Sequence, residues 1–256
     1  MKTISVHSYR GGTGKTTFLL NIAGELVKRG KRVLAIDFDL RAPAFQSYFK
    51  IKNPDYLSDY LLNKMDLDEV IIHGEERDKG RIDLIFSSME FLKQHSKQRD
   101  KLVRDDTVYL SKLYQLQKEV EGTYDYLLID TTPGFFYRSI DSMMISDILL
   151  IVATPTTSNV QGLEELWNNV YSMIKDDVNM YLLINMIEKQ GEKIDKELVE
   201  QSIKQLKQMG KKYFANKFIE IPDYGAMGER IHSFEQEPNK EFLNKITEIV
   251  DSITNS

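Results

Sequence analysis

YRGGTGKTT, residues 9–17, connects a predicted strand to a predicted helix. The run 3–7 before it alternates between polar and apolar residues, which is typical of a strand. Apolar residues at helical spacing follow it at Phe18, Leu19, Ile22, Ala23 and Leu26. A strand, a glycine-rich loop and a helix in this order bind phosphate groups in many proteins. The stretch therefore predicts a phosphate-binding loop (P-loop) at the end of the first strand.

Each residue type in the P-loop has a physical role. Glycines let successive backbone N–H groups curl around an anion, and the helix N-terminus adds a partial positive charge. Lys15 reaches the outer phosphates, and Thr16 offers its hydroxyl to Mg²⁺. The alternative is a glycine turn that only joins the strand to the helix. We predict that the phosphates contact Arg10, Gly11, Gly12, Thr13, Gly14, Lys15, Thr16 and Thr17.

The residues before the glycines indicate which family of P-loop proteins the chain resembles. The general pattern GxxxxGK[ST] has glycine where this chain has Tyr9, and the variant KGGxGK[ST] has lysine where it has Arg10. The loop resembles the deviant P-loop of the ParA/MinD superfamily, with arginine in place of the signature lysine. This resemblance implies that the ligands are ATP or ADP and Mg²⁺.

Arg10 stands at the position whose lysine, in ParA/MinD proteins, crosses a dimer interface and touches the nucleotide of the partner subunit. The resemblance therefore implies that Arg10 acts in trans, as a catalytic residue of an ATP-dependent homodimer. A guanidinium suits this role because it stays charged and binds phosphate oxygens bidentately. The alternative is that Arg10 pairs with a carboxylate nearby in its own chain.

Two acids end the next predicted strand, residues 31–39. Asp37 and Asp39 lie at the carboxyl edge, where parallel sheets bind ligands. By resemblance, Asp39 orients the water that attacks the γ-phosphate, and Asp37 lies nearer the water shell of the metal. The alternative is that these acids cap the next helix.

A further predicted strand, residues 124–130, ends in Asp130 and continues into the sequence TTPG. An aspartate at the end of a buried strand beside the P-loop holds Mg²⁺ through its waters. Gly134, after the proline, permits backbone movement when the γ-phosphate leaves. This is the Walker B and switch II pattern. Thr132 departs from the proline or alanine that is more usual in the ParA/MinD family.

The base-binding residues are predicted near the end of the chain. Asn185 ends the strand 180–185, and the family resemblance implies that its amide recognises adenine. The alternative is that this asparagine only forms a turn. The segment 219–223 resembles the Ile-Pro-x-Asp region whose backbone flanks the adenine, so Pro222 and Asp223 are assigned a backbone role.

Composition excludes several relatives. The chain has no cysteine, so it has no disulfide, thiolate zinc site or cysteine-ligated iron–sulfur cluster. This argues against the nitrogenase iron protein, the cluster scaffolds and the zinc-bridged tail-anchor targeting members of the superfamily. The chain also lacks an apolar run of about 18 residues and a signal-peptide core, which predicts a cytoplasmic protein.

Length and element order predict the fold. The 256 residues are 41% hydrophobic, and no linker, repeat or low-complexity tract divides them, so residues 1–256 are expected to form a single P-loop ATPase domain. Strands alternate with helices, and five strand ends point to one edge. This order predicts an α/β fold with a doubly wound, mostly parallel sheet and helices on both faces.

Three surface segments are candidate contacts for DNA or a membrane. The net charge of −5 gives no global attraction to nucleic acid. Two basic clusters nevertheless leave nonspecific DNA binding open, although a solvated helix face is the simpler interpretation. The clusters are Lys93, Lys97, Arg99, Lys101 and Arg104, and Lys204, Lys207, Lys211, Lys212 and Lys217. The helix 241–253 mixes acids with lysines, so it is expected to pack against the sheet rather than to bind a membrane.

The sequence thus predicts an ATPase switch of the ParA/MinD type. It would dimerise around Mg-ATP, hydrolyse it to ADP and phosphate with the help of an activating partner protein, and control the partitioning or positioning of a cargo. Two alternatives stay open. Leu40-Arg41 after Asp39 resembles bacterial tyrosine kinases, although the tail lacks their tyrosine cluster, and the unusual Tyr9 and Arg10 suit a module that binds ATP without hydrolysing it.

Overall fold

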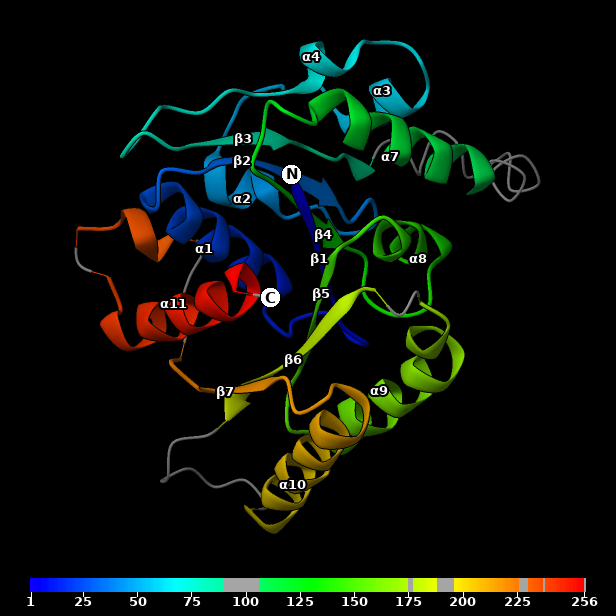
Figure 1. The fold of residues 1–256 in the computed structure, drawn as a ribbon, viewed down its shortest axis with the longest axis vertical. Coiled ribbons are helices and arrows are strands. Elements are labelled where there is room, and N and C mark those ends of the chain that lie inside the picture. Colours follow the sequence, from blue (N-terminus) through cyan, green and yellow to red (C-terminus); the bar gives the residue numbers. More distant parts are fainter. Residues whose placement is uncertain (90–105, 175–176, 188–195, 226–229, 237, 256) are drawn as a thin grey trace.

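The computed structural model describes residues 1–89, 106–174, 177–187, 196–225, 230–236 and 238–255. Its strands form one seven-stranded sheet in the order β3-β2-β4-β1-β5-β6-β7, and every pairing is parallel (Figure 1). The strands are β1 (Lys2–His7), β2 (Arg32–Phe38), β3 (Arg81–Ile85), β4 (Tyr126–Thr131), β5 (Ile148–Ala153), β6 (Asn179–Ile187) and β7 (Phe218–Pro222). The predicted parallel sheet is confirmed.

Helices cover both faces of the sheet (Figure 1). On one face, α1 (Lys15–Lys28) and α11 (Lys240–Thr254) share an apolar core with α2 (Phe45–Phe49). The opposite face is covered by α3 (Leu57–Leu61), α4 (Leu67–Val70), α7 (Asp106–Val120), α8 (Tyr137–Met144), α9 (Thr157–Asn169) and α10 (Lys196–Tyr213). Two short 3₁₀ turns are η2 (Tyr171–Met173) and η3 (His232–Phe234). The doubly wound arrangement is therefore also confirmed.

The central strands β4 and β5 are mainly apolar on both sides because helices lie on both sides. Every residue of β4 and β5 is buried. Near-continuous apolar runs of this kind are typical of parallel strands covered on both faces. In β4 the acidic residue, Asp130, comes only near the end of the strand.

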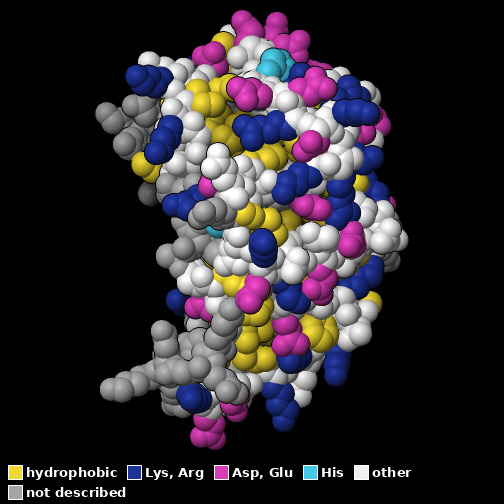
Figure 2. All heavy atoms as spheres, turned by 90° about the vertical axis from the view of Figure 1, so that its left-hand side faces the viewer, with side chains coloured by type: hydrophobic (Ala, Val, Ile, Leu, Met, Phe, Trp, Pro, Cys, Tyr) yellow, Lys and Arg dark blue, Asp and Glu magenta, His cyan; other side chains and the backbone are white. Residues whose placement is uncertain are grey.

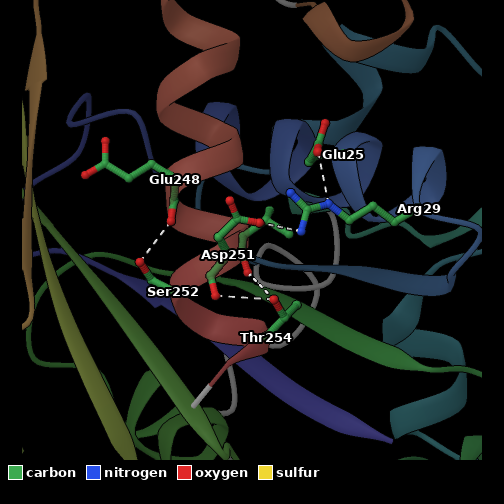
Figure 3. A network of polar contacts seen from close by, with 7 residues as sticks. Glu25, Arg29, Glu248, Asp251, Ser252 and Thr254 are labelled. Atoms are coloured by element: carbon green, nitrogen blue, oxygen red, sulfur yellow. Dashed lines mark hydrogen bonds and ion pairs between the residues drawn. The ribbon is translucent and has the colours of Figure 1, made fainter.

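The C-terminal helix packs against α1 and against the sheet at β7, and packing against the sheet is what the sequence predicts. Its residues Phe242, Ile246 and Ile249 are each at most 2% exposed. Arg29, the residue that follows α1, binds Asp251 at 2.7 Å and Glu25 at 3.0 Å (Figure 3). The apolar face of α11 is therefore largely buried in the protein.

The surface carries both signs of charge. On the face shown in Figure 2, lysine and arginine side chains are interspersed with aspartate and glutamate. The first basic cluster of the sequence analysis, between residues 93 and 104, lies outside the described residues. Among those that are described, no helix is long and apolar enough to cross a membrane.

Candidate nucleotide-binding site

The predicted site residues meet at the carboxyl edge of the sheet. The P-loop follows β1, and Asp37 and Asp130 are direct neighbours on the adjacent strands β2 and β4. Asn185 lies near the end of β6, and Pro222 ends β7. Because all strands are parallel, these positions reach the same edge although they are far apart in the sequence.

The P-loop has the backbone geometry of an anion site. Gly12 and Gly14 have φ angles of 75° and 97°, in the left-handed region that favours glycine. Gly14 is the N-cap of α1, so the first N–H groups of that helix face the loop. A Cβ at Gly14 would lie 2.8 Å from Nδ2 of Asn185, so the position also requires glycine for space. Lys15 is only 7% exposed and lies in this loop.

A cavity of about 420 Å³ extends from the P-loop to the predicted base residues. Its wall includes Gly12, Lys15 and Thr16 of the P-loop. The same wall includes Asn185 and Pro222, together with Asp223, Tyr224 and Phe242. A larger cavity of about 700 Å³ lies beside α3, α4 and α7, and it contains none of the predicted site residues. The smaller cavity therefore brings together the phosphate-binding and base-binding predictions.

A β-bulge places Asn185 in that cavity. The pairing of β6 with β7 shifts between Ile184 and Ile187, and Met186 adopts a left-handed φ of 57°. Bulges of this kind redirect a side chain at a sheet edge. Nδ2 of Asn185 donates to the carbonyl of Thr13 at 2.8 Å, which leaves one amide hydrogen and the amide oxygen for a ligand.

The backbone N–H and the carboxylate of Asp223 both have partners within the protein. Its backbone N–H donates to Ile187 at 2.8 Å, and its carboxylate accepts from the N–H of Gly225 at 2.8 Å. The side of the cavity near the predicted base is instead formed by Pro222, Tyr224 and Phe242. The backbone role assigned to Pro222 and Asp223 stays a prediction.

Asp130 and Thr16 have the chemistry of a magnesium site. The Thr16 hydroxyl donates a hydrogen bond to Oδ2 of Asp130. Oδ1 of Asp130 is buried without a hydrogen-bond partner in the described protein, although unpaired buried oxygens are costly. Burial raises the pKa of Asp130 to about 6, against the lowering effect of Lys15. A carboxylate oxygen and a hydroxyl are ligands that Mg²⁺ accepts, so the residues present fit this ion.

Asp37 binds the start of the next helix. One carboxylate oxygen accepts from the N–H groups of Ala44 at 2.8 Å and Phe45 at 3.0 Å, and the other from Asp39 at 3.2 Å. Burial, followed by the nearby charge of Asp130, raises the pKa of Asp37 well above its usual range. These contacts match the capping alternative for this residue, and its role near a metal stays a prediction.

Asp39 is held by its own loop and by the loop after β4. Its Oδ1 accepts from the backbone N–H groups of Arg41 and Ala42 and from the hydroxyl of Thr132, each at 3.1 Å. The guanidinium of Arg41 lies 4.2 Å from the ring centre of Phe136, in a cation–π contact. Two contacts therefore connect the loop after β2 to the loop after β4.

Arg10 is exposed at the edge of the site. Within the part of the chain that the structure describes, no carboxylate forms an ion pair with it. Its carbonyl accepts from the hydroxyl of Ser8 at 2.6 Å, which fixes its backbone. The side chain of Arg10 is thus available for a ligand or for a second protein chain.

Several polar contacts of the site were not found from the sequence. His7 binds Gly134 and Tyr171, Thr132 binds Asp39, and the Tyr48 hydroxyl is 3.0 Å from that of Thr17. The unusual Thr132 was visible as a departure from the family pattern, but its partner was not. The contacts of the two tyrosines join segments far apart in the chain, and no local pattern signals them.

Comparison with known proteins identifies the family. A family model described as an AAA domain (AAA_31) matches residues 1–184. The chain belongs to this family. A ParA family protein from Chlamydia trachomatis is 32% identical over 168 residues, which cover 65% of this chain and 64% of that protein. The match thus spans less than two thirds of the length of this ParA relative.

Solved structures of a plasmid partition protein and of MinD have the same fold. A plasmid partition protein from Borrelia burgdorferi bound to AMPPNP superposes with a TM-score of 0.72 at 22% identity, over 99% of this chain and 98% of that one. The cell division ATPase MinD from Pyrococcus furiosus gives 0.66 at 19% identity, over 98% of each chain. The predicted resemblance to ParA/MinD-type P-loop ATPases is confirmed.

Proposed function

We propose that this ParA/MinD-type protein is a switch that binds Mg-ATP, dimerises with it and separates after hydrolysis. One observation carries the proposal: a single cavity joins the P-loop, with Lys15 and Thr16, to Asn185 and Pro222. The two groups of lining residues suit the phosphates and the base of a nucleotide. The Borrelia relative bound to AMPPNP supports the choice of an adenine nucleotide as ligand.

The residues have separate roles in this proposal. Lys15 neutralises charge on the outer phosphates, and Arg10 adds a second cation from the partner subunit. Mg²⁺, when bound, neutralises further phosphate charge, and Thr16 and Asp130 would hold it. Asp39 orients the attacking water. Phosphoryl transfer needs little covalent chemistry from a protein, so positioning and charge neutralisation are sufficient.

The exposure of Arg10 supports a dimer. Arg10 is exposed beside the P-loop and forms no ion pair with the described residues, and a guanidinium can bind phosphate bidentately. A second copy of the chain bringing the same arginine would complete both sites by symmetry. The proposal also includes a single domain over residues 1–256 and a location in the cytoplasm.

The switch would control the partitioning or positioning of a cargo, with a partner protein that stimulates hydrolysis. Nonspecific DNA is one candidate surface, through the second basic cluster on α10 and after it. Three of its lysines already have protein partners: Lys207 pairs with Glu220 at 2.8 Å, Lys212 donates to the hydroxyl of Tyr213 at 2.9 Å, and Lys217 donates to Asn179 at 2.6 Å. Lys204 and Lys211 would carry more of such binding. Membrane binding is not part of the proposal.

The test is the mass of the Asp39→Ala variant in solution, measured by light scattering without nucleotide and with Mg-ATP. This variant should bind ATP without cleaving it, so the dimer should accumulate and the mass should double. Adding Arg10→Ala should return the mass to that of a monomer while ATP stays bound. A monomer that holds ATP in every condition would contradict the dimer and favour a tyrosine-kinase-like phosphotransferase or a non-hydrolysing binding module.

A further inference from the structure

His7 is a buried residue that the proposed function does not use. It ends β1, directly before the P-loop, and its side chain is fully buried. Both ring nitrogens have a partner. Nδ1 lies 2.6 Å from the hydroxyl of Tyr171, and Nε2 lies 3.1 Å from the carbonyl oxygen of Gly134.

The partners fix the protonation of the ring. A carbonyl oxygen only accepts hydrogen bonds, so Nε2 carries the proton and donates it to Gly134. Nδ1 is then the acceptor, and the Tyr171 hydroxyl donates to it. Burial, with the charge of Lys15, lowers the pKa of His7 to about 3, so the ring is neutral near pH 7.

Gly134 is attached to β1 on both of its polar groups. Its N–H donates to the carbonyl of Ser8 at 2.8 Å, and its carbonyl accepts from His7. Gly134 belongs to residues 131–136, which we call the switch segment. The same segment contains Thr132, whose hydroxyl donates to Asp39 at 3.1 Å. The position of Gly134 therefore limits where Thr132 can lie relative to Asp39.

We propose that His7 is a positioning residue for ATP hydrolysis, which holds Gly134 so that Thr132 keeps its contact with Asp39. Tyr171 supports this role because its hydrogen bond to Nδ1 fixes the orientation of the ring. The inference rests on the proposed function, in which Asp39 orients the attacking water. It adds a link from η2, which follows α9, to the nucleotide site.

The first variant removes one hydroxyl and little else. Tyr171→Phe removes the hydroxyl that holds Nδ1, so the ring can turn and its bond to Gly134 weakens. The matched control is Tyr181→Phe, which also removes one tyrosine hydroxyl with a hydrogen-bond partner. The Tyr181 hydroxyl is part-buried and donates to the carbonyl of Ser252 at 2.9 Å, away from the switch segment. We expect kcat to fall about fivefold in Tyr171→Phe, the value of one ordinary hydrogen bond, with KM for ATP unchanged. Tyr181→Phe should keep both constants.

A second pair of variants tests the donor itself. The side-chain amide nitrogen of His7→Gln replaces Nε2 and can donate to Gly134, whereas His7→Leu has no donor. His7→Gln should keep most of kcat, and His7→Leu should lose at least as much as Tyr171→Phe. If both variants fold and lose kcat equally, or if Tyr171→Phe matches Tyr181→Phe, the inference is overturned.

A spectroscopic readout separates this inference from the proposed function. The nitrogen NMR shifts of His7 should show a protonated Nε2 and a bare Nδ1 in the wild type at pH 7. In Tyr171→Phe the Nδ1 shift should move to that of a nitrogen that accepts no hydrogen bond. This measurement needs no hydrolysis. Wild type that fails to hydrolyse ATP would overturn the proposed function. Active wild type with unchanged nitrogen shifts and kcat in Tyr171→Phe would overturn only the role of His7.

Discussion

The hydroxyl of Thr132 donates a hydrogen bond to Oδ1 of Asp39 across 3.1 Å, and both side chains are buried. The same oxygen accepts two backbone N–H groups of its own loop. The carboxylate of Asp39 is thus held by three donors, of which only Thr132 comes from another strand end. Thr132 therefore contacts the residue to which we assign the positioning of the attacking water.

Removing that hydroxyl should slow hydrolysis without weakening ATP binding. Thr132→Val keeps the shape of the side chain but not the donor, so kcat should fall about fivefold, equivalent to about 1 kcal/mol, while KM stays within about twofold. Thr132→Ser keeps the donor and is the matched control. Steady-state phosphate release measures both. Equal kcat in the valine and serine variants would show that the contact has no part in turnover.

Lys15→Ala should lose nucleotide binding. Hydrogen bonds from a charged group are worth about 1.5–3 kcal/mol each, and Lys15 lies in the P-loop wall of the cavity. Affinity for ATP should therefore fall about 100-fold, as measured by calorimetry. The control is Lys28→Ala, which changes an exposed lysine at the far end of the same helix. Normal ATP affinity in Lys15→Ala would contradict the assignment of this cavity as the nucleotide-binding site.

Asn185→Ala should weaken selection of the base rather than binding of phosphate. We expect affinity for ATP to fall about tenfold and the preference for ATP over GTP to shrink, since one or two hydrogen bonds to the base are lost. Affinity for inorganic tripolyphosphate should change less. Asn179→Ala, at the opposite end of β6, is the control. A variant that still distinguishes ATP from GTP as the wild type does would assign base recognition elsewhere.

The fold was predictable because its signals are local. The glycines after β1, the acids at the ends of β2 and β4 and the apolar runs between them each occupy a few consecutive residues. Parallel pairing then brings the strand ends together without further information. The contacts of His7 and Thr132 were not predictable, because each joins segments more than 90 residues apart. Asp37 was harder still, since a carboxylate at a strand end suits a metal and a helix start equally well.

His7 should lower the free energy of unfolding of the nucleotide-free protein in mild acid. The native state keeps this ring neutral down to a pKa of about 3, whereas the unfolded chain binds a proton on it below about pH 6.5. The unfolded state therefore binds more protons between these values, and the free energy of unfolding falls as the pH falls. From pH 7 to pH 5 this loss should be about 2 kcal/mol.

Urea unfolding of wild type and His7→Gln at both pH values isolates this contribution. The variant has no ring to protonate, so its loss of stability from pH 7 to pH 5 should be smaller by about 2 kcal/mol, whatever its stability at pH 7. All other titrating groups are common to the two proteins. Parallel pH dependence in the two would mean that His7 is protonated in the native state as readily as in the unfolded chain.

The ring of Tyr9, the residue before Arg10, should leave room only for glycine at position 162 of α9. A Cβ at position 162 would lie 2.0 Å from that ring. Gly162→Ala should therefore lower the free energy of unfolding by about 1–3 kcal/mol, although alanine is the better helix former. In a Tyr9→Ala background the same substitution should be neutral or stabilising, so a double-mutant cycle in urea should show a coupling of at least about 1 kcal/mol.

Because Tyr9 precedes Arg10, displacement of the Tyr9 ring by Gly162→Ala should also weaken the ATP-dependent dimer. Additive effects of the two substitutions would mean that the ring moves away from the helix at no cost.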